Sequence, residues 1–206
     1  MFSGVAVFVL EWGISNDIGV MRHLNLGTPA TLLIAILFLD FFGAYVSHVI
    51  LHKVSVLWRV HSVHHSDTMI DVTSALRQHP FETLYRMSFV VLGALFLGIP
   101  FWMLGLYMLL LVGNGQLEHA NISYPEKLER LLRQVFVTPD FHKVHHSTNA
   151  DESNSNFGNI FTIWDRLFGT YESNCELKDL RYGLNDSCDD EDGGSVKDLL
   201  LLSTGE

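Results

Sequence analysis

The feature that most constrains this chain is a histidine triplet that occurs twice. Its members have the spacing i, i+3, i+4 and are His61, His64, His65 and, in the second copy, His142, His145, His146. On a helix, these three positions lie on one face. Three imidazoles on one face predict half of a metal site, so two triplets predict a site for two metal ions.

A histidine pair precedes the first triplet. His48 and His52 are spaced i, i+4, which allows two helical histidines to bind one ion. These three clusters hold eight of the eleven histidines. A single histidine on an apolar face is more often a packed core residue or a helix cap than a ligand. Packing gives no reason to repeat a triplet of poor helix formers, so we interpret the clusters as metal ligands.

The composition favours a membrane protein. Apolar residues make up 48% of the 206 residues, and the formal net charge is −10. Most of that charge lies in residues 172–206, which we expect to be an acidic, mobile tail after a domain formed by residues 1–171. No basic patch interleaved with aromatic residues suggests nucleic-acid binding. Cys175 and Cys188 are the only cysteines, and we expect reduced thiols facing the cytosol.

Residues 29–52 give the clearest transmembrane helix. Their 24 positions would extend about 36 Å, enough to cross a hydrocarbon core of about 30 Å. Asp40 lies inside this segment, one, two and three steps of i+4 before Ala44, His48 and His52. Its carboxylate either orients a ligand histidine or hydrogen-bonds another helix. Lys53 and Arg59 follow, which places the histidine end at the cytosol.

Other segments predict further contacts with the membrane. Residues 1–14 are either the remainder of a membrane segment or an interfacial helix, and residues 15–28 form a polar loop. Residues 84–113 are apolar but interrupted at 98–100. The two halves, 87–97 and 101–113, are each short for a crossing, and a hairpin turning at 98–100 would return His119 to the side of the triplets.

Residues 126–137 form a predicted amphipathic helix, suited to the membrane surface or to ordinary packing. One face carries Leu128, Leu131, Leu132, Val135 and Phe136, and Lys127, Arg130 and Arg133 lie off it. The expected fold is therefore all-α: an integral membrane helical bundle with a cytosolic, helical, histidine-rich cap.

The choice of metal follows from the chemistry. Neutral imidazole suits zinc, copper, iron and nickel. Eight or nine histidines exceed one closed, four-ligand zinc site. A site beside an apolar bundle suits an alkyl chain or sterol, and oxidation of an unactivated C–H bond needs a redox metal, which zinc is not.

Taken together, the motifs resemble the fatty acid hydroxylase / sterol desaturase superfamily of membrane di-iron oxygenases. The resemblance runs from about Asp40 to Tyr171. Besides the three histidine clusters, it includes the stretches at 76–82, 119–121, 156–158 and 164–171. Val49 departs from the pattern, because members often carry arginine there, and the stretch before the first box is short.

The resemblance implies two iron ions, dioxygen as co-substrate, a lipid substrate and a separate electron donor of the cytochrome b5 or ferredoxin type. The implied ligands are His48, His52, His61, His64, His65, His119, His142, His145 and His146. His79 also matches a motif of the family. It could be a ligand or a residue that hydrogen-bonds to a ligand, so it stays outside this set. Asn121, Asp140 and Asp165 are candidates for orienting imidazoles, and residues 164–171 could instead be a packing element that closes the site.

Two classes of function remain at this point. One is an oxygenase that hydroxylates or desaturates a lipid C–H bond. The other is a histidine-rich membrane protein that binds or transports zinc without redox turnover. A transporter should hold its ligands within a transmembrane path, whereas most of these histidines follow the span in polar stretches.

Overall fold

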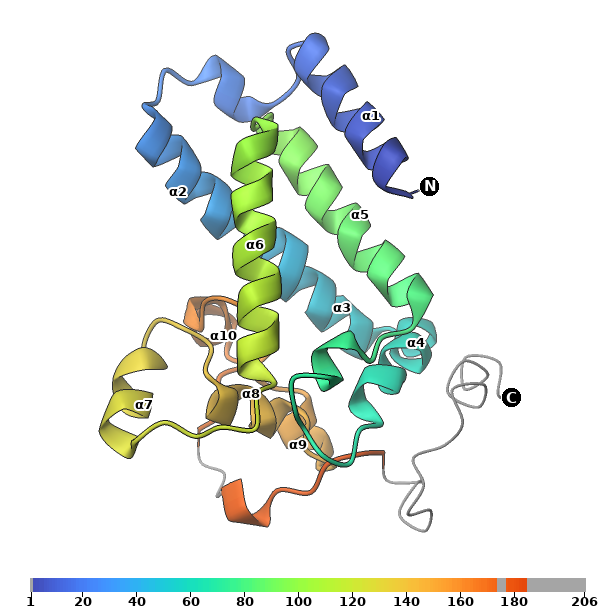
Figure 1. Ribbon diagram of the computed structural model, residues 1–206, viewed down its shortest axis with the longest axis vertical. Helices are drawn as coiled ribbons and strands as arrows, with labels where there is room; N and C mark the ends of the chain where they lie inside the picture. Colours follow the sequence, from blue (N-terminus) through green and yellow to red (C-terminus); the bar gives the residue numbers. More distant parts are fainter. Residues whose placement is uncertain (1, 174–176, 185–206) are drawn as a thin grey trace.

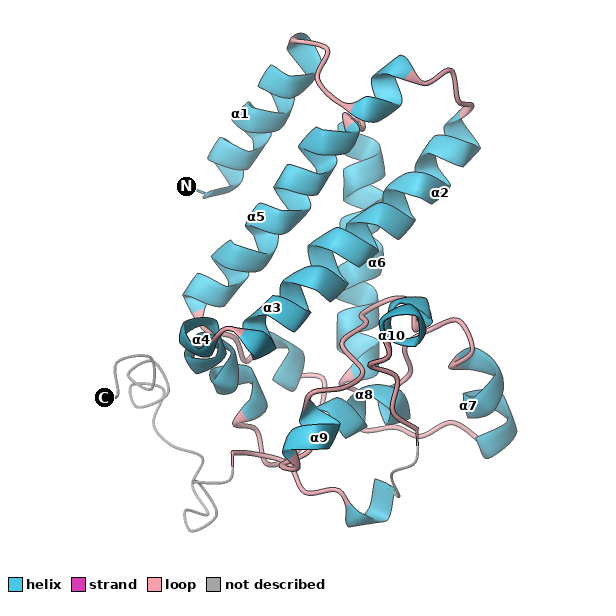
Figure 2. Ribbon diagram, turned by 180° about the vertical axis from the view of Figure 1, so that it is seen from behind, coloured by secondary structure: helices cyan, strands magenta, loops and turns pink. Residues whose placement is uncertain are grey.

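The computed structural model describes residues 2–173 and 177–184, and within them the secondary structure is helical without a β-strand. Long helices form a bundle, and short helices with their loops gather at one end of it (Figure 1). The view from behind shows the same division (Figure 2). Three stretches are long and apolar enough to cross a membrane: Gly4–His23, Thr28–Lys53 and Pro80–Leu97. The predicted all-α membrane bundle is confirmed.

The N-terminal stretch is helical over α1 (Phe2–Ser15), and a 3₁₀ turn, η1 (Val20–His23), interrupts the predicted polar loop. The predicted span at 29–52 is one continuous helix made of three parts: α2 (Thr28–Leu39), the π-helical η2 (Asp40–Val46) and α3 (Ser47–Lys53). Pro29 occupies its first turn, where the missing N–H costs nothing. The π-helical part was not predicted.

The predicted hairpin consists of α5 (Pro80–Leu97) and α6 (Phe101–Glu118), which run in opposite directions (Figure 1). Gly98 makes the turn with φ 70°, and a Cβ there would lie 2.5 Å from the Ile18 carbonyl oxygen. Only glycine suits both conditions. Each helix has 18 residues, or about 27 Å, so both are longer than the predicted 87–97 and 101–113.

The apolar core joins α1, α2, α5 and α6. Its largest member is Tyr107, which is fully buried and donates its hydroxyl to the Leu39 carbonyl at 2.9 Å, just before the π-helical part. Gly43 allows close packing, since a Cβ there would lie 3.0 Å from Val90. This core fixes the long helices relative to one another and so fixes the histidines at their ends.

The histidine-bearing end contains short elements. These are α4 (Ser55–His65), η3 (Ser74–Leu76), α7 (Glu126–Leu132), α8 (Pro139–His145), α9 (Ala150–Ser153), α10 (Ile163–Phe168) and η4 (Leu177–Asp179). Helix α7 ends five residues before the predicted 137, because Phe136 pairs with Phe161 and the Val137 N–H donates to the Ile160 carbonyl. Leu131 is exposed at 63%, so the apolar face of α7 is not packed on the core.

The chain after Glu172 remains in contact with the body where it is described. The Thr148 N–H donates to the Arg181 carbonyl at 2.8 Å, and Ser147 pairs with Tyr182. The predicted mobile tail falls largely on residues 185–206, and Cys175 and Cys188 lie outside the described residues.

Candidate metal centre

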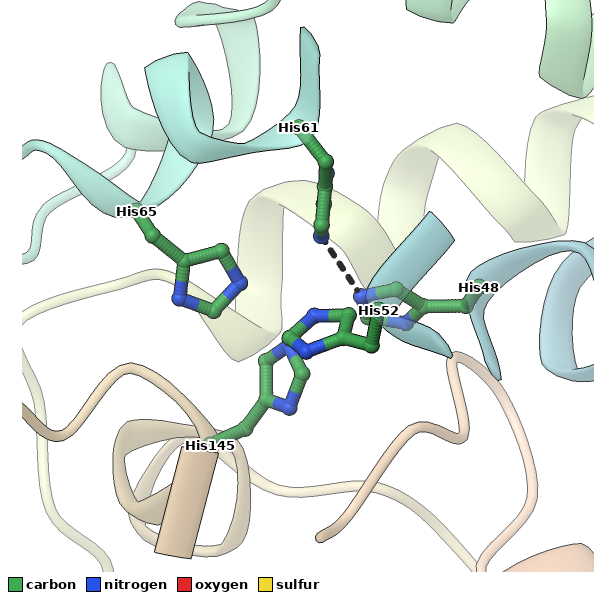
Figure 3. A group of neighbouring side chains, drawn as sticks. All are labelled: His48, His52, His61, His65 and His145. Carbon is green, nitrogen blue, oxygen red and sulfur yellow. Dashed lines mark hydrogen bonds between the residues drawn. The ribbon is translucent and has the colours of Figure 1, made fainter. Parts of the chain in front are cut away.

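The structure brings all nine predicted ligand histidines into two neighbouring groups. The first group is His48, His52, His61, His65 and His145 (Figure 3). The second group is His64, His119, His142 and His146. Within each group, one ring nitrogen from every histidine lies within 4.8 Å of those from all the others. His52 is partly exposed, and the other eight are buried.

Each sequence triplet is divided between the two groups. His61 and His65 on α4 face the first group, whereas His64 faces the second. On α8 the division is reversed, because His145 belongs to the first group and the i, i+4 pair to the second. The expectation that the three imidazoles of one triplet converge on half of a site is therefore wrong. The i, i+4 pair and the i+3 residue point to different centres, and each triplet bridges both.

In the first group, three histidines have their Nδ1 atoms fixed by oxygen acceptors. His48 Nδ1 donates to the Phe157 carbonyl at 2.9 Å, and His145 Nδ1 donates to the Ser155 carbonyl at 2.7 Å. His61 Nδ1 donates to Glu82 Oε1 at 2.8 Å. Because a carbonyl or carboxylate oxygen accepts, Nδ1 carries the hydrogen and each neutral ring turns the lone pair of Nε2 toward the group.

Two of the four histidines in the second group follow the same rule, whereas the Nδ1 atoms of His142 and His146 are buried without a hydrogen-bond partner among the described residues. His64 Nδ1 donates to the Ser74 carbonyl at 3.1 Å, and His119 Nδ1 donates to the Gly115 carbonyl at 2.7 Å. Their Nε2 atoms are 3.1 Å apart. The Nε2 atoms of His142 and His146 lie 3.2 and 3.1 Å from that of His119. Four ring nitrogens thus surround one point.

These contacts fit bound cations. The Nε2 atoms of His48 and His61 lie 3.0 Å apart, along the dashed line in Figure 3, and those of His64 and His119 lie 3.1 Å apart. Because each of these neutral rings carries its hydrogen on Nδ1, neither Nε2 atom of a pair has a hydrogen to donate to the other. Such lone pairs repel unless a cation lies between them. Protonation does not relieve the repulsion, because burial lowers the pKa of one histidine in each pair: that of His61 below 6.5 and that of His64 well below it. The buried Nε2 atoms of His52, His65 and His145 also have no hydrogen-bond partner among the described residues.

Two glutamates beside the groups were not predicted as site residues. Glu82 on α5 is fully buried, and its Oε1 accepts from both His61 and Arg86, at 2.8 and 2.9 Å. Glu118 at the end of α6 accepts from Asn159 Nδ2 at 3.0 Å and lies 3.9 Å from His142 Nε2. Burying a carboxylate in an apolar helix costs free energy, so an acidic residue there usually has a function. This was the signal in the sequence that could have identified both glutamates.

A cavity of about 260 Å³ opens onto the histidines. At one end, its walls include His48, His64, His119 and His142. The remaining walls are mainly apolar side chains from α5 and α6: Met87, Val90, Met108, Leu111 and Val112. The volume is near the small end of the range for ligand pockets.

A family model described as fatty acid hydroxylase matches residues 32–170, which is well over half of the chain. The chain belongs to this family. The resemblance seen in the sequence is confirmed, and all nine histidines lie inside the matched region.

Curated relatives in this family are lipid-oxidising enzymes by name. An ornithine lipid hydroxylase from Rhizobium tropici is 33% identical over 64% of this chain and 39% of its own. Alkylglycerol monooxygenases from Caenorhabditis elegans and Homo sapiens are 27% and 31% identical, over 89% and 76% of this chain and 35% and 34% of theirs. The chain therefore spans little more than a third of these relatives. No solved structure matches it.

Asp40 does not contact a histidine. Its carboxylate accepts from the backbone N–H groups of Ile160 and Phe161, at 3.1 and 3.2 Å, and from Trp164 Nε1 at 2.8 Å. Of the two predicted roles, the hydrogen bond between elements is the one observed. Asp165 accepts from the N–H groups of Phe157 and Gly158. Asp165 thus holds the 156–158 stretch, whose Phe157 carbonyl orients His48, and Asp40 holds the residues that follow it.

The other predicted orienting groups lie apart from the imidazoles. Asp140 accepts from Ser123 Oγ at 2.8 Å and from Lys143 Nζ at 3.1 Å, and Asn121 is exposed. His79 Nδ1 accepts the Phe81 N–H and caps α5, outside both groups. Five of the nine histidines are thus oriented by backbone carbonyls or by Glu82.

Proposed function

We propose that this protein is a membrane-bound, non-haem di-iron oxygenase that hydroxylates or desaturates a C–H bond of a lipid. The observation that carries the proposal is the pair of imidazole groups that border a mainly apolar cavity, with Nε2 lone pairs directed toward one another within each group. The ligands would be the five histidines of the first group and the four of the second.

Iron is proposed because unactivated C–H bonds need a redox metal. Two iron ions, with dioxygen as co-substrate and two electrons from a separate donor of the cytochrome b5 or ferredoxin type, supply the oxidation. The chain's own residues bind the ions, orient the imidazoles and exclude water. The walls of the cavity hold the alkyl part of the substrate beside His64 and His142.

We further propose that the histidine end faces the cytosol. Lys53 and Arg59 follow the span at this end, and the basic side chains of α7 lie near it. Cytosolic placement would give the electron donor access to the centre. Residues 1–171 would form the catalytic domain, and residues 172–206 would contribute no ligand.

Lipid mass spectrometry tests the proposed activity. Membranes of cells that make the protein should contain a lipid heavier by one oxygen, or lighter by two hydrogens for desaturation, that is absent from cells without it. His142→Ala should remove the product at equal protein level, and His23→Ala should retain it, because His23 is exposed and outside both groups. Zinc in the purified protein and no new lipid would favour the zinc-binding alternative.

A further inference from the structure

One charged residue of the cavity wall, Arg86, is not part of either histidine group. Arg86 lies on α5, inside a stretch apolar enough to cross a membrane, and its side chain is 23% exposed toward the cavity that it lines. A charged residue at such a position is expensive and requires a partner or a function. Arg86 has one partner and unused hydrogen-bonding capacity.

The partner is Glu82. Arg86 Nε donates to Glu82 Oε1 at 2.9 Å, and this is its one hydrogen bond among the described residues. No hydrogen bond of its two terminal amino groups is found among the described residues, and Gln78 and Thr83 line the same cavity as Arg86. The guanidinium fork is suited to bidentate binding of a carboxylate or phosphate.

The position of Arg86 along the cavity is fixed by the same carboxylate oxygen. Glu82 Oε1 also accepts from His61, so Arg86 lies at the histidine end. On the α6 wall, Glu118 is held by Asn159 and Asn114. An anion entering the cavity is attracted to the guanidinium of Arg86.

We propose that the cavity takes a lipid carrying an anionic group, a carboxylate or phosphate, and that the terminal amino groups of Arg86 bind this group. The apolar chain then lies along Met87, Val90 and Leu111. That a lipid reacts in this cavity rests on the proposed function; the preference for an anion does not. The anchor at the histidine end places the oxidised carbon near the anionic group.

A purely structural role predicts something different. If Arg86 serves only to balance the charge of Glu82, its replacement alters His61 and metal content but not the choice of ligand. The two roles are separated by measuring binding, without turnover, for lipids that differ only in their polar group.

The experiment uses the full chain as purified in a non-ionic detergent, under argon, with its metal content recorded. Scintillation proximity measures the binding of radiolabelled hexadecanoate, hexadecyl phosphate and hexadecanol at pH 8. The parent protein should bind one or both anions at least about tenfold more tightly than the alcohol, the size expected for one charge-assisted pair. Arg86→Gln should reduce the preference to within about twofold, and Arg86→Lys should retain part of it.

Arg130→Gln is the matched control, since Arg130 is an exposed arginine on α7, outside the cavity. It should bind like the parent. Equal binding of anions and alcohol by the parent, or an unchanged preference in Arg86→Gln, overturns the proposal. If Arg86→Gln does not fold, the parent preference and Arg86→Lys still decide. Absence of iron or of an oxidised lipid would contradict the proposed function alone.

Discussion

A buried imidazole presents a lone pair to a cation only when its hydrogen is held elsewhere. Backbone carbonyls hold the Nδ1 hydrogens of His48, His64, His119 and His145. His61 differs, because its acceptor is the carboxylate of Glu82. A carboxylate raises the basicity of the ring as well as orienting it. We therefore expect Glu82 to support the proposed metal binding more than any single carbonyl acceptor does.

Glu82→Gln should weaken metal binding by the first group by about 10–100-fold, because the amide lacks the charge that both His61 and Arg86 contact. Competition with a chelator, followed by metal analysis, measures the change. Asp140→Asn is the control, since Asp140 contacts Ser123 and Lys143 rather than a histidine. Equal metal affinity in Glu82→Gln and the control would show that Glu82 does not support His61.

At this scale, the sequence predicted the ligands better than their surroundings. Histidine spacing selected eight of the nine residues that gather in two groups, and the family resemblance added His119. Spacing could not divide them between the two groups, because the i+3 and i+4 positions of a helix diverge by enough to face different groups. The acceptors at Nδ1 are carbonyls of distant loops, such as Phe157 and Ser155, and no side-chain pattern marks a carbonyl.

Among the elements, the helix over Thr28–Lys53 shows most clearly what periodicity leaves out. The ends of this helix were predicted from the length of the apolar segment and from Pro29. Nothing in the amino-acid composition of residues 40–46 indicates that Asp40–Val46 is π-helical. A π turn advances by five residues instead of four, so a stripe drawn at i+4 does not stay on one face. Asp40 accordingly faces the loop that ends at Trp164, while His48 faces the metal centre.

Asp40→Asn should destabilise the fold without removing a ligand. Three N–H donors converge on the carboxylate, and an amide offers one acceptor oxygen and an NH₂ group that opposes a donor. A buried donor without an acceptor costs about 1–3 kcal/mol, so the unfolding temperature in detergent should fall by several degrees. Asp17→Asn, at an exposed ion pair with Arg22, should leave it near the parent value. An unchanged temperature for Asp40→Asn would contradict this role.

For the whole molecule, the long helices determine on which side of the membrane the centre lies. The hairpin of α5 and α6 returns the chain to the histidine end, and His119 thereby joins His64. The sequence predicted this reversal from Gly98 and the need to bring His119 back. The orientation of the whole molecule in a membrane depends on the charges at the helix ends rather than on contacts within the bundle.

Cysteine labelling tests that orientation. With Cys175 and Cys188 replaced by serine, single cysteines at Lys53, Lys127 and Glu172 should be labelled from the cytosolic side. A cysteine at His23 should be labelled from the other side, because η1 lies at the opposite end of the bundle (Figure 1). Labelling of positions 53 and 127 from opposite sides would contradict a single histidine-bearing face.

The central claim is that the two histidine groups hold two iron ions. Metal analysis with Mössbauer spectroscopy of ⁵⁷Fe-grown protein tests it most directly. The account predicts two irons per parent chain, loss of bound iron in His145→Ala from the first group and in His142→Ala from the second, and parent content in His23→Ala. One iron per chain, zinc in place of iron, or two irons retained in His145→Ala would contradict it.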